Sequence, residues 1–216
     1  MKPDYALLDN GVPFIAWKKV YADLQRKHKK GTEAFYTRLI MEWLWRLSTT
    51  IGTPCTILES DTLIYFTYFE EEVAEERFNI IRQVRSTIID TFGDIVPKSY
   101  VGKNMIVELE NVDFYYRYIS HFYPPTRRGK HAQTFAQSWG CLCNDGYLQV
   151  VLSNEAKPYL SPIVSHELAH LFLAYYRPPL WLDEGIATIV RNPLKSAVRS
   201  GNKKPLSHSP IGSFRQ

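Results

Sequence analysis

The stretch from Ser165 to Val190 reads SHELAHLFLAYYRPPLWLDEGIATIV, and it contains two histidines four residues apart around a glutamate. On an α-helix, residues i and i+4 lie one turn apart on the same face, so His166 and His170 can approach one ion. This H-E-x-x-H arrangement is typical of zinc sites in which the glutamate, here Glu167, accepts a proton from a water held by the metal.

The residues around this motif predict a buried helix. Leu168, Leu171, Phe172 and Tyr175 form an apolar face opposite the histidines, and Pro162 stands just before the predicted helix. Two imidazoles and a carboxylate that are turned into a protein interior need a partner there. A metal ion supplies that partner, and we therefore expect zinc.

A third metal ligand is expected from the segment that follows. Catalytic zinc takes three protein ligands and leaves the fourth position to water. Pro178 and Pro179 should break the first helix, and Asp183 should then cap a second helix in which Glu184 faces back to the histidines. The alternative is that Glu184 is only a first-turn acid stabilised by the helix dipole. We favour the ligand because the chain offers no better placed carboxylate or histidine.

The two motifs, HELAH at 166–170 and WLDEGIAT at 181–188, carry a family resemblance. Together they resemble the gluzincin metallopeptidases, and most of all the peptidase MA-like group, with H-E-x-x-H followed by W-L-x-E-G-x-A. The resemblance covers roughly residues 52–191 and implies a thermolysin-like zincin fold. It implies that His166, His170 and Glu184 bind Zn²⁺ and that Glu167 is the general base. It also implies that Thr188, four positions after the third ligand, supports a zinc-bound histidine.

The resemblance extends to substrate binding and leaves one role open. The hairpin strand before the motif helix resembles the edge strand that pairs with substrate backbone, so we expect a peptide along Trp139 to Cys143, centred on Gly140, Cys141 and Leu142. The alternative is an ordinary strand with a structural glycine. Related enzymes place a tyrosine or histidine beyond the third ligand to stabilise the oxyanion. The candidates here are Tyr175, Tyr176, His131 and His208.

The rest of the chain predicts an α+β fold: a small mixed sheet with the active-site helix and the glutamate helix, preceded by a helical segment. We expect a helical N-terminal segment at 1–50, a zincin-like metallopeptidase domain at 51–200 and a mobile tail at 201–216. Apolar periodicity predicts helices near 17–24 and 32–48 and a long helix from Glu70 to a cap at Gly93. The expected strands lie at 54–60, 61–69 and 103–110 and in a hairpin at 138–153.

Composition limits the classes of protein that fit. The net charge of +4, from 26 basic and 22 acidic residues, does not by itself indicate nucleic-acid binding. The basic clusters at 26–30 and 127–130 are interpreted as solvated loops. Three cysteines cannot all pair within one chain, which favours a reducing compartment. We find no signal peptide and no membrane span, so a cytoplasmic location is expected.

These observations predict a zinc-dependent peptidase that acts on peptide or protein substrates, without nucleic-acid or membrane partners. The alternative is a zinc-binding but catalytically silent regulatory or interaction module. That alternative draws on the unassigned oxyanion donor, on the short C-terminal portion and on the N-terminal helices, which would then cover the cleft. A basic nucleic-acid-binding domain with structural zinc is the weakest interpretation, because structural zinc sites rarely keep an open coordination position. The sequence does not predict the oligomeric state.

Overall fold

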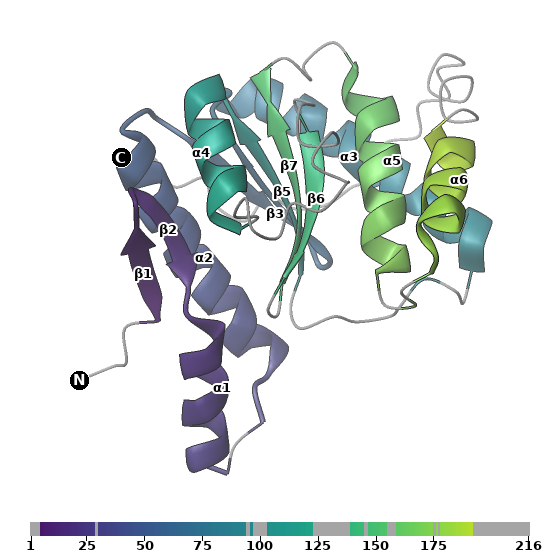
Figure 1. The fold of residues 1–216 in the computed structure, drawn as a ribbon. Coiled ribbons are helices and arrows are strands. Elements are labelled where there is room, and N and C mark those ends of the chain that lie inside the picture. Colours follow the sequence, from purple (N-terminus) through teal and green to yellow (C-terminus); the bar gives the residue numbers. More distant parts are fainter. Residues whose placement is uncertain are drawn as a thin grey trace.

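The computed structural model describes residues 5–28, 30–93, 96, 103–122, 139–144, 147–154, 159–174, 176 and 178–191. This part of the chain is an α+β protein in which helices cover both faces of a five-stranded mixed sheet (Figure 1). For residues 139–144 and 147–148 the structure describes only the backbone. The expected mobile tail lies outside the described residues.

The chain begins with a β-hairpin, not with a helix. Strands β1 (Ala6–Asp9) and β2 (Val12–Ile15) pair antiparallel, and Asn10 and Gly11 join them with φ values of 50° and 74°. Positive φ at both central residues is what a two-residue type I′ turn requires, and Asn-Gly is the sequence that tolerates it best. The expectation of a wholly helical N-terminal segment is therefore wrong for this hairpin.

The two helices expected next are present. They are α1 (Trp17–Arg26) and α2 (Glu33–Ile51). Helix α2 begins after Thr32, whose side chain accepts a hydrogen bond from the backbone N–H of Phe35, a standard N-cap. The indole N–H of the buried Trp43 donates to the carbonyl of Pro13 at 2.7 Å, and this bond attaches the hairpin to α2.

The sheet has the order β3-β4-β5-β7-β6. Its three central strands run parallel, and the two edge strands β3 and β6 run antiparallel to their neighbours. The strands predicted from the sequence are confirmed, with these bounds: β3 (Thr56–Glu59), β4 (Leu63–Thr67), β5 (Asn104–Leu109), β6 (Trp139–Asn144) and β7 (Tyr147–Ser153).

Four further helices accompany the sheet: α3 (Glu71–Phe92), α4 (Val112–Phe122), α5 (Leu160–Leu173) and α6 (Leu180–Arg191). Helix α3 ends at Gly93, as the sequence predicts, where φ is 56°. Because α5 begins at Leu160, Pro162 lies within its first turn, where a missing N–H costs no helical hydrogen bond. Within the described residues, no helix is both long and apolar enough to cross a membrane.

Two apolar cores lie on opposite faces of the sheet. Side chains alternate along a strand, so Met105, Val107 and Leu109 of β5 join one core while Ile106 joins the other. The first core contains the hairpin, α1, α2 and α4, and the second contains α3, α5 and α6. The N-terminal segment therefore packs on the face opposite α5, as Figure 1 also shows. The domain boundary at residue 50 remains a prediction.

A buried charged cluster connects α3 to the sheet. Arg77 of α3 pairs through two guanidinium nitrogens with the carboxylate of Glu108 on β5, and one of these contacts, Nε to Oε2, measures 3.1 Å. The hydroxyl of Tyr65 on β4 donates to the same carboxylate, and burial raises the pKa of that hydroxyl above its usual range. Glu108 and Tyr65 are completely inaccessible to solvent. This cluster holds three elements together beneath α3.

Candidate metal centre

Helix α5 places the two histidines of the motif side by side. Its residues are buried on almost every side, as expected for a helix that is apolar around most of its circumference. The Nε2 atoms of His166 and His170 lie 3.0 Å apart, and the rings meet edge to face with centroids 4.6 Å apart. The side chain of His166 is 16% exposed and that of His170 is 14% exposed. The two imidazoles thus converge on one point at the surface of an otherwise buried helix.

Helix α6 brings Glu184 to the same point. Its Oε2 lies 3.6 Å from Nε2 of His166, and its Oε1 lies 3.7 Å from Nε2 of His170. The side chain of Glu184 is 44% exposed, so the cluster is open to solvent on this side. The three residues that the sequence singled out therefore form one group that could hold a metal ion.

The spacing of these atoms fits a small tetrahedral ion. Zinc binds imidazole nitrogen and carboxylate oxygen at about 2.0–2.2 Å, which separates two ligand atoms of a tetrahedron by about 3.3 Å. The two imidazole nitrogens lie 3.0 Å apart, and each has a different oxygen of Glu184 at 3.6 or 3.7 Å. With one ligand atom taken from each residue, all three lie within 4.8 Å of one another, so a small adjustment of side chains would bring them around one ion. Two imidazoles and one carboxylate are also the donor set of one class of catalytic zinc site. The residues present are thus suited to Zn²⁺ and leave one coordination position for water.

Asp183, and not Thr188, is the residue whose side chain lies beside a histidine of the cluster. Asp183 Oδ1 lies 3.0 Å from Nδ1 of His170, although the angle between them is poorer than a hydrogen bond requires. Thr188 is exposed on α6, and within the described residues no hydrogen bond joins it to either histidine. The role expected for Thr188 thus has no support in the geometry. A carboxylate behind a histidine fixes the tautomer that leaves Nε2 free for a metal.

The expected capping role of Asp183 is also corrected. Helix α6 begins at Leu180, directly after Pro178 and Pro179, and the backbone N–H groups of Leu182 and Asp183 both donate to the carbonyl of Pro179. Asp183 therefore lies inside the first turn and does not precede it. This earlier start turns its side chain toward α5.

Glu167 is a buried carboxyl at the edge of the cluster. Its exposed fraction is 5%, and burial raises its pKa from 4.5 to about 7, with smaller upward contributions from Glu184 and Asp183. The charges of His170 and Arg191 act in the opposite direction. A carboxylate whose pKa lies near neutrality can both accept and return a proton at physiological pH, as a general base must.

The electrostatics of His166 also favour metal binding. Burial lowers its pKa, and His170 lowers it further, while Glu184 and the backbone of Ala187 act against this shift. Nδ1 of His166 is buried without a hydrogen bond of acceptable geometry. A lowered pKa keeps the imidazole neutral, which is the form that binds a metal.

The strand expected to bind substrate is an edge strand of the sheet that the described residues form. Strand β6 pairs only with β7 among the described strands, with Gly140 opposite Val151 and Cys141 opposite Val150. Helix α5 packs against both strands. The backbone of Gly140, Cys141 and Leu142 therefore forms part of an edge strand next to the helix that carries the cluster, and its role in binding remains a prediction.

Of the four candidate oxyanion donors from the sequence, Tyr175, His131 and His208 lie outside the described residues. Tyr176 is described and is 50% exposed in the connection between α5 and α6. The oxyanion donor therefore remains unassigned.

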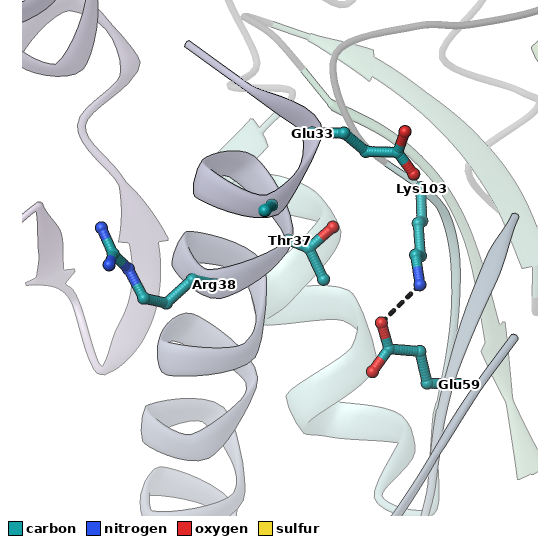
Figure 2. Close-up of a pocket in the computed structure, with 6 residues that line it drawn as sticks. Glu33, Thr37, Arg38, Glu59 and Lys103 are labelled. Atoms are coloured by element: carbon teal, nitrogen blue, oxygen red, sulfur yellow. Dashed lines mark hydrogen bonds and ion pairs between the residues drawn. The ribbon is translucent and has the colours of Figure 1, made fainter. Parts of the chain in front are cut away.

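A separate hollow of about 570 Å³ lies between α2 and the β3 side of the sheet. Glu33, Ala34, Thr37, Arg38, Glu59 and Lys103 line it. Figure 2 shows that Lys103 and Glu59 pair with each other across it, while Arg38 points to the other side of α2. Its charged groups therefore do not converge on a common point, unlike those of the metal cluster.

Comparisons of the chain with protein-family models, with curated proteins and with solved structures found no match. What the protein does must therefore be inferred from the geometry of the cluster formed by His166, His170 and Glu184 and from the residues around it.

Proposed function

We propose that this protein is a zinc-dependent peptidase of the gluzincin type, built on a thermolysin-like zincin fold. The observation that carries the proposal is the convergence of His166, His170 and Glu184 from two helices, with one potential ligand atom of each within 4.8 Å of the others. Beside them stands Glu167, a buried carboxyl whose pKa is about 7. Three ligands, one free position and an adjacent base are the parts that metal-assisted hydrolysis needs.

The position of β6 supports a peptide as the substrate. An extended peptide can add to an open sheet edge through main-chain hydrogen bonds, whatever its side chains. The backbone of Gly140, Cys141 and Leu142 offers such an edge, and α5 packs against the same strand. A peptide bound there would run beside the helix that carries the proposed base.

Each residue of the proposed site would have a separate role in the reaction. When bound, zinc would lower the pKa of a water ligand toward about 7 and polarise the scissile carbonyl. Glu167 would accept the proton of the attacking water and pass it to the nitrogen of the leaving amine. Asp183 would hold His170 in the tautomer that presents Nε2 to the ion.

The alternative is a zinc-binding module without catalytic activity. One argument for it was that the N-terminal helices would cover the cleft, whereas α1 and α2 pack on the face of the sheet opposite α5. Its other arguments, the unassigned oxyanion donor and the short C-terminal portion, still stand.

The test combines zinc content with peptide cleavage. Wild type and Glu167→Gln should each bind one zinc ion, and only wild type should cleave a mixed peptide library read by mass spectrometry. Glu184→Ala should lose both properties. A matched control is Glu75→Gln, which changes an exposed glutamate on α3 and should retain both. Cleavage by Glu167→Gln at the wild-type rate would contradict the assigned base, and zinc binding without any cleavage by wild type would favour the silent module.

A further inference from the structure

Helix α6 carries large apolar side chains on the side that faces solvent. Trp181 is 74% exposed, Ile189 is 68% exposed and Leu182 is 37% exposed. Steps of three and four residues connect Trp181 and Leu182 through Gly185 to Ile189, so these four positions lie on one side of the helix. A Cβ added at Gly185 would meet nothing outside the helix within 4 Å, so this side is open. We call these four residues the α6 patch.

The opposite side of α6 is the one that joins the protein core. Ala187 and Val190 are buried in the second core, and α6 packs mainly against α5. Figure 1 shows α6 at the periphery of the fold, beyond α5. A surface helix of a globular protein usually carries polar residues on its outer side. The α6 patch departs from that pattern, and such an exposed apolar surface is typical of an interaction site.

The chain from residue 185 onward is basic. It contains six of the 26 basic residues, at positions 191, 195, 199, 203, 204 and 215, and none of the 22 acidic residues. The first 184 residues contain the other 20 basic side chains and all 22 acidic ones, which is a net charge of −2. The formal charge of +4 is therefore due entirely to the basic stretch, residues 185–216, which begins on α6.

An apolar helix face next to basic residues fits the surface of an anionic membrane. Helices that lie in the membrane interface bury Trp, Leu and other apolar side chains at the level of the lipid headgroups. Tryptophan is enriched at that level, and each Lys or Arg close to the surface strengthens binding to anionic lipids severalfold. We propose that the α6 patch inserts into the surface of an anionic lipid bilayer, and that the basic stretch attracts the protein to it.

The same two features fit other partners less well. A nucleic acid would be bound by the basic residues, but it offers no apolar layer for Leu182 and Ile189. A second copy of the chain would meet the patch through a twofold axis, which would bring two basic stretches of like charge together. The expectation of no membrane partner rested on the lack of a spanning segment, which a surface-bound helix does not need. The proposal is independent of the peptidase function.

The experiment measures how much of the full chain sediments with lipid vesicles. Wild type should bind vesicles of phosphatidylcholine with about 30% phosphatidylserine at least tenfold more tightly than vesicles of phosphatidylcholine alone. Raising the salt concentration from about 0.1 M to about 0.5 M should weaken that binding, because salt screens the attraction. Trp181→Ser and Ile189→Ser should each weaken binding to the anionic vesicles by about tenfold, because each removes an inserted apolar side chain.

The matched controls remove similar side chains from the other side of the molecule. Trp45→Ser on α2 and Leu8→Ser on β1 change residues that are 48% and 66% exposed, on elements that pack on the opposite face of the sheet. Both should bind vesicles like wild type. Fluorescence gives a second readout: lipids brominated in their acyl chains should quench wild type, and Trp181→Phe should still bind but lose most of this quenching.

The proposal is wrong if wild type does not bind the anionic vesicles. It is also wrong if Trp181→Ser and Ile189→Ser bind as tightly as the controls, since the basic stretch would then act alone. Two results obtained without vesicles would assign the patch to another occupant. Dissociation of a dimer by these variants in light scattering would indicate a second copy, and a loss of Tm beyond that of the controls would indicate that the chain itself covers the patch.

Discussion

Replacing Glu108 by glutamine should destabilise the protein strongly, because it leaves the guanidinium of Arg77 buried without a counter-ion. Glu108 is fully buried, and the side chain of Arg77 is only 11% exposed, so water cannot take the place of the lost carboxylate charge. Breaking a buried ion pair by changing one partner costs about 3–5 kcal/mol. Glutamine keeps one oxygen acceptor for Arg77 or Tyr65, so we expect the lower end, about 3 kcal/mol.

The assay is urea unfolding followed by fluorescence of the buried Trp43, on metal-free protein. For a slope of about 2–3 kcal/mol per molar urea, a loss of about 3 kcal/mol moves the midpoint down by about 1–1.5 M. Glu59→Gln is the matched control, because it breaks the half-exposed pair with Lys103 and should cost less than about 1 kcal/mol.

A double variant, Arg77→Met with Glu108→Gln, completes the comparison. It removes the uncompensated charge, so it should cost less than the sum of the two single changes, with a coupling of about 1.5 kcal/mol or more. The reasoning is refuted if Glu108→Gln costs no more than Glu59→Gln, or if the two single changes simply add.

Three further predictions concern the metal cluster. Zinc at a thousandfold excess over its Kd should stabilise wild type by about 4 kcal/mol and raise Tm by about 10 °C, and His166→Ala should abolish this shift in a thermal melt. Asp183→Asn should weaken zinc affinity about 10–100-fold because His170 loses its orienting carboxylate, whereas Thr188→Val should leave it unchanged in a competition titration. Finally, the metal-free protein should depend on pH through Glu167. Its folded pKa of about 7 lies above the ordinary value of 4.5, so its stabilising contribution is complete below pH 4.5 and is lost as pH rises through 7. The loss relative to Glu167→Gln should reach about 3 kcal/mol in unfolding experiments at pH 4.5 and 8, and equal pH dependence of the two proteins would contradict it.

Most of the sheet and most of the helices could be predicted because each has a clear local signal. The long helix from Glu71 to Phe92 has a constant apolar period and a glycine cap, and the alternating strands are bounded by turn residues. The missed hairpin also had a signal, because Asn10-Gly11 is the strongest short hairpin sequence. Its strands are only four residues long, too short for alternation to identify them.

The metal cluster could be predicted as far as spacing along the chain determines it. Helical geometry puts His166 and His170 one turn apart on one face, and their side-chain conformations then bring the Nε2 atoms to 3.0 Å. The position of Asp183 beside His170 could not be predicted in this way. Whether the residue before or the residue after Glu184 faces the histidines depends on where α6 begins and on how α6 crosses α5. Both are decided by tertiary packing.

The two cores on opposite faces of the sheet separate the part of the molecule that contributes only stability from the part that carries the proposed site. One side carries the hairpin and its two helices, and the other carries the proposed chemistry, with β4, β5 and β7 as a shared wall between them. A saturation mutagenesis experiment should therefore separate into two phenotypes. Changes at Trp43 or Leu44 should reduce how much protein accumulates in cells without altering the turnover of each surviving molecule. Changes at His170 or Glu184, partly exposed members of the metal cluster on α5 and α6, should produce normal amounts of an inert protein.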